Sequence, residues 1–115
     1  MSAARHKFGA VQTVRDGITF SSKLEAAYFD HLTLLQIAGV VVGFLRQTPF
    51  HLPGATKYLV DFTVFWADGT VTFDDPKGAE TEIYKLKMRQ VRALYPWASV
   101  RALNYKGKQW VEVTG

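Results

Sequence analysis

The sequence of 115 residues contains no cysteine. This absence excludes a disulfide-stabilised fold, a zinc site built on thiolates and a cysteine nucleophile. The chain also lacks a long apolar run, because the stretch at 34–45 is shorter than the roughly 18 residues of a membrane-spanning helix. No apolar segment follows the basic start of the chain, so the sequence indicates no export signal. We therefore expect a cytoplasmic protein that makes no contact with membranes.

Apolar residues are numerous enough to form one core. Hydrophobic residues make up 48% of the chain and charged residues 21%, a balance that excludes general disorder. The length suits one domain, and there is no repeat, low-complexity tract or internal linker. The sequence predicts a single domain over 11–115, preceded by a loose basic tail over 1–10.

Basic residues are concentrated in the last third of the chain. Residues 1–76 hold six Lys or Arg and seven Asp or Glu, whereas residues 77–108 hold eight Lys or Arg and two acids. A basic surface of this kind favours a polyanion as partner. A solvated helix face has the same pattern, and charge alone does not choose between the two interpretations.

Apolar spacing and turn residues predict an α/β fold. The helix expected after the first hairpin is capped by Ser22 and ends at Gly39, and the apolar run Val40–Leu45 predicts a buried strand. The expected elements are a hairpin at 11–20, a helix at 22–38, strands at 40–50, 58–66 and 71–77, a helix at 81–95, and strands at 97–104 and 109–114. This order predicts a mixed sheet flanked by helices.

Three charged residues in the predicted strands need a chemical explanation. Asp61 lies in an apolar stretch, where a charge should be paired or bound to a metal. Asp75 and Lys77 are two positions apart on the next strand, so their side chains share one face of the sheet. An ion pair between Asp75 and Lys77 would explain these two residues without any function.

The turn between the two strands decides whether Asp61 joins that face. A two-residue loop at 68–69 would turn Asp61 away from Asp75. A type I turn centred on 67–68, with Gly69 as a left-handed bulge residue, would place Asp61 directly opposite Asp75. Both loops suit the sequence, and we predict the second because it explains the charge of Asp61.

A pair of carboxylates formed by Asp61 and Asp75 would require a cation, because two like charges a few ångströms apart repel each other. Oxygen ligands without cysteine or a histidine cluster favour Mg²⁺, with Mn²⁺ as a substitute, over zinc. The histidines have no ligand spacing, and core packing is the default role of the tryptophans, since base stacking would require exposure. These residues are His6, His31, His51, Trp66, Trp97 and Trp110.

Four motifs follow one another along the chain: Ser22-Lys23-Leu24-Glu25-Ala26, Gln47-Thr48-Pro49-Phe50, Tyr58-Leu59-Val60-Asp61-Phe62 and Asp74-Asp75-Pro76-Lys77-Gly78. Over about residues 5–95 they resemble the small phage-associated branch of the PD-(D/E)XK nuclease superfamily. The resemblance implies a restriction-endonuclease-like αβββαβ core. Val60 replaces the proline of the superfamily's name, and Asp75 stands where many relatives have glutamate.

The resemblance also implies Mg²⁺-dependent hydrolysis of DNA phosphodiester bonds. Asp61 and Asp75 would hold the metal, together with the backbone carbonyl of Pro76. Lys77 would orient the attacking water or stabilise the charge that develops on phosphorus. In this interpretation Asp61, Asp75 and Lys77 are catalytic.

Two further positions match the superfamily. Glu25 matches the acid on the first helix, a fourth catalytic residue in this interpretation, which would hold a water or a second ion. The run from Ser22 to Glu25 is also a capping box, which would explain Glu25 without catalysis. Gln47 matches a glutamine that some branches place beside the active site.

The second predicted helix carries basic residues that would track the phosphate backbone of DNA. They are Lys85, Lys87, Arg89 and Arg92. Without a sequence-reading element, we expect a structure-selective enzyme for branched or Holliday-junction DNA, phage-encoded and located in the host cytoplasm. A homodimer suits paired cuts on a two-fold substrate. The alternatives are a nucleic-acid-binding accessory module that keeps the fold without cleaving, and a basic structural module in which the motif is a coincidence.

Overall fold

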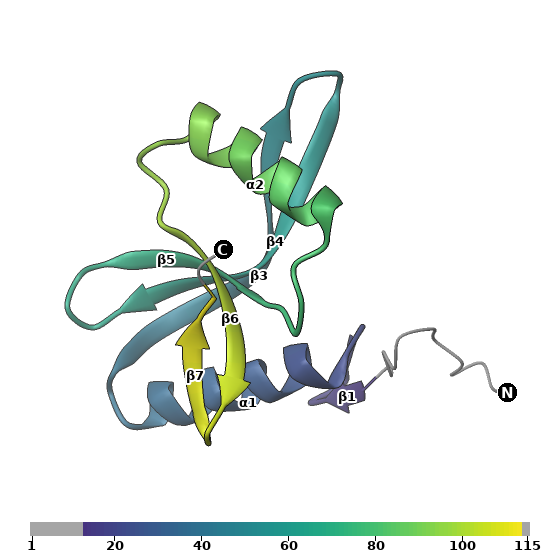
Figure 1. Cartoon of the computed structure of the whole chain (residues 1–115). Helices are drawn as coiled ribbons and strands as arrows, with labels where there is room; N and C mark the ends of the chain where they lie inside the picture. Colours follow the sequence, from purple (N-terminus) through teal and green to yellow (C-terminus); the bar gives the residue numbers. More distant parts are fainter. Residues whose placement is uncertain (1–12, 114–115) are drawn as a thin grey trace, which may run out of the picture.

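A five-stranded mixed sheet forms the centre of the computed structural model, which describes residues 13–113 (Figure 1). Neighbouring strands are antiparallel except β5 and β6, which are parallel because a helix, α2 (Glu82–Leu94), connects them. In spatial order the strands are β3 (Val41–Leu52), β4 (Thr56–Trp66), β5 (Val71–Pro76), β6 (Val100–Lys106) and β7 (Gln109–Glu112). The predicted α/β class with a mixed sheet is confirmed. The predicted basic tail over 1–10 lies outside the described residues.

The first helix, α1 (Lys23–Ile37), has the predicted start and end. It follows a small hairpin of β1 (Thr13–Arg15) and β2 (Ile18–Phe20). The side chain of Ser22 accepts a hydrogen bond from the Glu25 N–H at 3.1 Å, which satisfies a backbone donor at the helix start. Gly39 follows the helix with φ 81°, a conformation that glycine adopts without strain.

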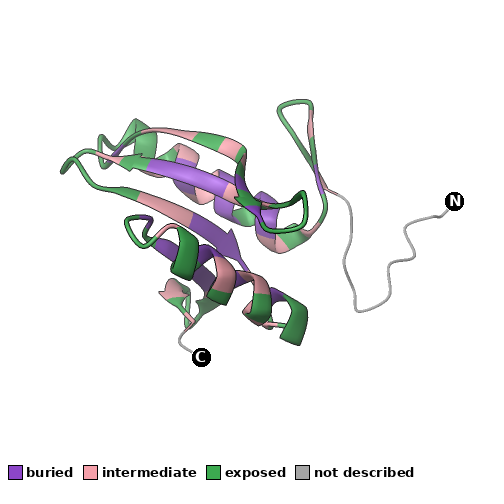
Figure 2. Cartoon of the chain, turned by 90° about the horizontal axis from the view of Figure 1, so that it is seen from above, coloured by how far each residue is buried: buried purple, intermediate pink, exposed green. Residues whose placement is uncertain are grey.

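The core consists of two clusters, one under each helix. The cluster of α1 contains Phe62 and Val64 of β4, whereas the cluster of α2 contains Val60 of the same strand. Val60, Phe62 and Val64 are alternate residues and therefore point to one side of β4, which reaches both clusters because the β3–β4 hairpin curves along its length (Figure 1). Figure 1 shows the β3–β4 hairpin rising beside α2 at one end, while α1 lies across the other end of the sheet. In Figure 2 the outer side of α2 is exposed.

The prediction of a buried strand at Val40–Leu45 is wrong. Val41 is buried, but Val42 is 68% and Leu45 60% exposed. β3 is the edge strand of the sheet, and edge and central strands share the same β-branched composition. No helix within residues 13–113 is long and apolar enough to cross a membrane.

Candidate functional site

The β4–β5 hairpin places Asp61 opposite Asp75. Phe62 of β4 is paired with Asp74 of β5. In the same register the next residues along the two strands, Asp61 and Asp75, lie opposite each other. Gly69 has φ 92° and donates its N–H to the carbonyl of the residue three positions before it, which is a type I turn followed by a left-handed bulge residue. The predicted register is confirmed, and the alternative two-residue loop is wrong.

The β4–β5 ladder ends at Asp61, where both β3 and β4 bend. The Asp61 N–H donates to the Asp75 carboxylate, Oδ1, at 2.9 Å. On its other side β4 pairs with β3, where Arg46 and Thr48 are paired and Gln47 between them is not. Gln47 has φ 61°. A non-glycine residue at positive φ inside a strand is strained. Gln47 therefore lies beside Asp61 at the bend, and its side chain is exposed.

Asp61 brings the predicted catalytic residues into one electrostatic cluster. Burial raises the pKa of Asp61 to about 8, and the carboxylates of Asp75 and Glu25 raise it as well. The cations Lys77 and Arg46 act in the opposite direction. Within residues 13–113 the Asp61 carboxylate accepts no hydrogen bond and forms no ion pair. Asp61 is thus a half-buried acid whose oxygens are open to a ligand.

Asp75 is held by two tyrosines that the sequence analysis did not single out. Its side chain is 1% exposed, and Oδ2 accepts hydrogen bonds from the Tyr58 hydroxyl at 2.7 Å and the Tyr84 hydroxyl at 3.4 Å. Burial raises the pKa of Asp75, and the bond from Tyr58 opposes that rise. Burial also raises the pKa of both tyrosines, which keeps them protonated as donors. The sequence signal was slight, because a tyrosine in an apolar stripe is typical of a core.

Lys77 stands just beyond β5. Its N–H donates to the carbonyl of Leu103 at 2.7 Å, and its Nζ lies 4.9 Å from the centre of the Tyr84 ring, a cation–π geometry. Pro76, before it, is the last residue of β5. Within residues 13–113 no direct ion pair joins Lys77 to Asp75, so the explanation of these residues as a strand-end ion pair is wrong.

Glu25 is buried at the start of α1, and both of its carboxylate oxygens have partners. Oε1 accepts from the N–H of Ser21 at 3.2 Å and from its hydroxyl at 2.9 Å, and Oε2 accepts from Arg46 at 3.1 Å. In a capping box this side chain would bond the N–H of Ser22, so the contact is displaced by one residue. Glu25 thereby joins the start of α1 to β3 next to Asp61.

Arg46 is a third residue that the sequence analysis missed. Its guanidinium lies 4.5 Å from the centre of the Phe20 ring and pairs with Glu25. Its Nε is buried without a hydrogen-bond partner in the described part of the chain. Arg46 partly neutralises the acidic cluster.

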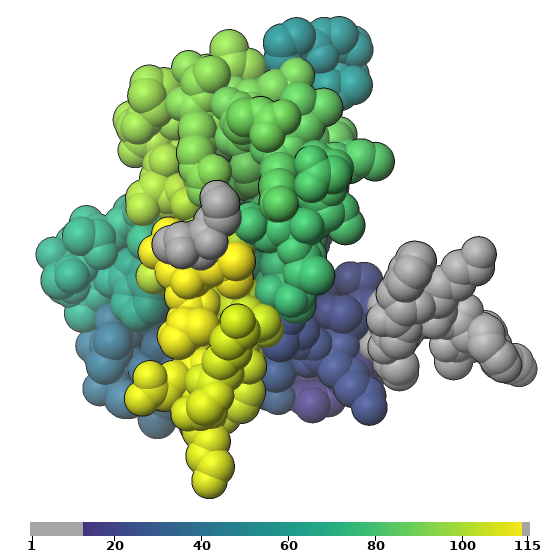
Figure 3. Space-filling model, in the orientation of Figure 1, coloured from purple at the N-terminus to yellow at the C-terminus, as the bar shows by residue number. Residues whose placement is uncertain are grey.

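The basic residues predicted to contact DNA lie on α2, which covers much of the face seen in Figure 3. Lys85 lies 3.5 Å from Glu82, Lys87 is half-buried, and Arg89 and Arg92 are exposed. Arg101 does not belong to this surface, contrary to the expectation of a uniformly basic last third.

Arg101 instead forms an ion pair inside the fold. It donates two hydrogen bonds of 2.8 Å to the fully buried Asp74, which also accepts one from the Tyr28 hydroxyl. Such a bidentate pair holds the buried charge of Asp74 between β5 and β6. Asp74 therefore has a cationic partner inside the fold, whereas Asp75, next to it, is held by the neutral donors Tyr58, Tyr84 and the Asp61 N–H.

Asp61 and Asp75 supply the oxygen ligands that Mg²⁺ prefers. Within residues 13–113 no group of three or more His, Cys, Asp or Glu is arranged to hold a metal ion. Mg²⁺ is commonly bound by one or two carboxylates and completes its shell with water and substrate phosphate. The open carboxylate of Asp61 beside Asp75 fits that mode of binding.

The fold and this site define an α/β protein with a carboxylate pair at a bend in its sheet. The family model that matches residues 5–107 is described as "Protein of unknown function (DUF1064)". The chain belongs to this family. No curated protein and no solved structure matches significantly, so the function must be argued from the site.

Replacing Tyr58 with phenylalanine should destabilise the protein by about 1–3 kcal/mol, since the buried Asp75 carboxylate loses its shortest side-chain hydrogen bond. Urea unfolding at neutral pH measures this change. Tyr105→Phe, at an exposed tyrosine, is the matched control and should change stability by less than about 0.5 kcal/mol. Equal stability of Tyr58→Phe and wild type would contradict the role given to Tyr58.

Proposed function

We propose that this protein is a Mg²⁺-dependent endonuclease that hydrolyses DNA phosphodiester bonds at a PD-(D/E)XK-type centre. The observation that carries the proposal is the β4–β5 register, which sets Asp61 opposite Asp75 and leaves Lys77 just beyond the strand. The element order from α1 to β6 agrees with the restriction-endonuclease-like αβββαβ core that the sequence motifs imply. This agreement supports the proposal.

The residues of the site divide the chemistry among them. Asp61 and Asp75, with the Pro76 carbonyl, would hold Mg²⁺, which would supply the charge that polarises the scissile phosphate and activates a water. Lys77 stabilises the negative charge that develops on phosphorus, because it is a compact cation beside Asp75. Tyr58 keeps Asp75 in place by its hydrogen bond.

Glu25 and Gln47 border this centre from two other elements. Glu25 is buried and paired with Arg46, so its role is to hold the start of α1 against β3 and to add negative charge near Asp61. Gln47 lies opposite Asp61 on the neighbouring strand β3. Its exposed amide there can bind a water or a phosphate.

The substrate that fits is duplex DNA with a branch. Lys85, Lys87, Arg89 and Arg92 on α2 neutralise phosphates without reading bases. A protein that does not read sequence is selective through the shape of the substrate, as in flapped or four-way DNA. A homodimer places two centres on a two-fold junction. An enzyme of this class serves phage DNA recombination in the host cytoplasm.

A non-cleaving nucleic-acid-binding module is the second candidate. It is favoured by the hydrogen bonds that already satisfy Glu25 and Asp75, and by the lack of a three-ligand group within residues 13–113. The open carboxylate of Asp61 weighs against it, since a half-buried acid without a partner is costly unless it has a ligand.

Cleavage of end-labelled DNA tests the proposal. Linear, flapped and four-way substrates are incubated with the protein in Mg²⁺, Mn²⁺ or EDTA. We expect cuts in both metals, none in EDTA, and faster cutting of branched than of linear DNA. Binding of the same substrates without cuts in either metal would favour the non-cleaving module.

Exposed arginines of α2 should determine the salt dependence of DNA binding. Each phosphate contact contributes about 0.9 to the slope of log K against log salt. The double variant Arg89→Ala, Arg92→Ala should therefore reduce that slope by about 2, measured in EDTA on branched duplex. Lys57→Ala, which removes an exposed lysine of β4, should leave it unchanged. An unchanged slope in the α2 variant would remove α2 from the DNA-binding surface.

A further inference from the structure

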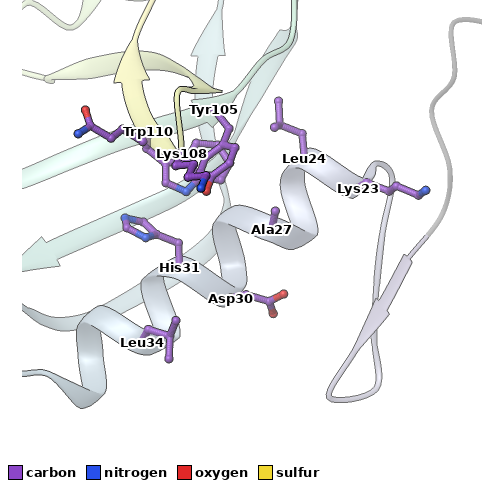
Figure 4. A pocket seen from close by; sticks show the side chains of 10 residues that line it. Lys23, Leu24, Ala27, Asp30, His31, Leu34, Tyr105, Lys108 and Trp110 are labelled. Carbon is purple, nitrogen blue, oxygen red and sulfur yellow. The ribbon is translucent and has the colours of Figure 1, made fainter.

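A groove of about 900 Å³ lies between α1 and the β6–β7 hairpin (Figure 4). The carboxylates of Asp61 and Asp75 do not line it. The side chains that matter for its chemistry are Lys23, Asp30 and His31 of α1, and Tyr105, Lys108 and Trp110 of the hairpin. A volume of this order is typical of sites that take a small organic ligand or one unit of a polymer.

Aromatic rings form one wall of the groove. The Trp110 ring centre lies 5.2 Å from that of Tyr105 and 6.0 Å from that of His31. Behind it, the buried Tyr28 packs edge-on at 4.8 Å, which holds the indole in place. Tyr105 is 51% exposed, and Trp110 and His31 are half-buried. The wall is therefore a rigid aromatic surface with an open side.

The Trp110 indole also has an unused donor, because its N–H makes no hydrogen bond within residues 13–113. Aromatic faces of this kind stack on nucleobases, which adds about 1–3 kcal/mol per base in proteins that bind single strands. Bases in an intact duplex already stack on one another, so they do not offer their faces to such a wall.

The charge of the groove is positive. Lys23 and Lys108 are exposed and form no ion pair within residues 13–113. The one acid of the groove, Asp30, is neutralised by Arg15 at 2.9 Å. Lysines beside an aromatic wall are the combination with which proteins bind single-stranded nucleic acid, since the lysines meet phosphates while the rings meet bases.

One end of the groove lies at the start of α1, the helix terminus that carries Glu25. Lys23 and Leu24, at one end of the groove, directly precede Glu25 in the helix. A strand lying in the groove would thus pass the same helix terminus that borders Asp61. This proximity links the groove to the branch of a DNA substrate.

We propose that this groove binds a single-stranded segment of DNA, with a base stacked on Trp110 and Tyr105 and phosphates beside Lys23 and Lys108. This inference rests on the proposed nuclease function and deepens it. It identifies substrates that carry a single-stranded flap or gap, rather than fully paired junctions, as the ones that fit the protein.

The test is binding of a short labelled oligothymidylate in EDTA, followed by fluorescence anisotropy. The variant combines Tyr105→Leu with Lys108→Gly, because both side chains are exposed and glycine suits the φ of 64° at position 108. We expect this double variant to bind the single strand at least roughly tenfold more weakly, as the loss of one stacked base predicts. The affinity of the double variant for a hairpin duplex should fall less than its affinity for the single strand.

Lys57→Ala is the matched control, since it removes an exposed lysine of β4 outside the groove. It should bind the single strand like wild type. Wild-type affinity in the groove variant, or tighter binding of the matching oligoribonucleotide than of the DNA, would overturn the inference. If the groove variant bound the single strand more weakly but wild type cut no DNA, the nuclease proposal would be overturned. The proposal that the groove binds single-stranded DNA would then still hold.

Discussion

Lys77→Ala should lower the rate of metal-dependent DNA cleavage by at least roughly 100-fold. Removal of one group that stabilises charge in the transition state typically has an effect of this size. In the structure, Lys77 has no ion-pair partner within residues 13–113 and lies against the Tyr84 ring beside Asp75. Its charge is therefore available to the substrate.

Single-turnover cleavage of flapped DNA with enzyme in excess measures the effect of Lys77→Ala on the chemical step. DNA binding in EDTA should fall far less than the cleavage rate, because one lysine contributes a single contact to a larger basic surface. Lys57→Ala again serves as the control and should cut at nearly the wild-type rate. Cleavage by Lys77→Ala at the wild-type rate would show that the centre lies elsewhere.

Asp61→Asn should stabilise the metal-free protein at pH 8 while it abolishes cleavage. Burial raises the pKa of Asp61 in the folded protein to about 8, whereas an aspartate in an unfolded chain has a pKa of about 3.9. Between these two values the folded state binds more protons than the unfolded state. The free energy of unfolding therefore falls as the pH rises from about 4 to 8.

Asparagine at position 61 carries no charge, so the variant does not lose unfolding free energy at this position as the pH rises. We expect Asp61→Asn to be more stable than wild type at pH 8 by at least about 1.4 kcal/mol, the equivalent of one pKa unit. Below pH 4 the difference should vanish, because Asp61 is then neutral in both states. Urea unfolding in EDTA at several pH values measures the difference.

Asp30→Asn is the control for Asp61→Asn, because Asp30 is a half-exposed acid paired with Arg15. It should give no gain in stability at pH 8. Added Mg²⁺ should stabilise wild type and not Asp61→Asn, since only wild type keeps both carboxylates that hold the ion. If wild type were as stable as Asp61→Asn at pH 8 in EDTA, the raised pKa of Asp61 in the folded protein would be contradicted.

Elements whose ends are set by neighbouring residues could be predicted from the sequence. Ser22 caps the first helix and Gly39 ends it, as expected, and the second helix begins within one residue of the predicted start. Capping depends on side chains within one turn of the helix end. The same local chemistry made a left-handed Gly69 foreseeable, although the choice between two hairpin registers needed the charge of Asp61 as an additional argument.

Burial of the strands could not be predicted in the same way. Val40–Leu45 has the composition of a central strand, yet it forms the edge of the sheet. The order of strands depends on how α2 and β6 pack, and those elements are far away in the sequence. A run of β-branched residues predicts that a segment is extended, but it does not predict which strands lie next to it in the sheet.

The partners of the site residues also depend on distant parts of the chain. Tyr84 reaches Asp75 from α2, and Arg46 reaches Glu25 from β3. Arg101 counts as a surface cation in the sequence, but its bond to Asp74 forms only when β6 lies parallel to β5. Each of these side chains has an ordinary interpretation in its own element.

By itself, the sequence determined the helices and the turns, because these follow from contacts within a few residues. Only the tertiary structure decided that the Asp61 carboxylate has no hydrogen-bond partner within residues 13–113, that two tyrosines hold Asp75, and that Trp110 lines a groove beside α1. Such features arise where segments tens of residues apart meet. Their energies come from burial and from charges brought together in space, which no local pattern records.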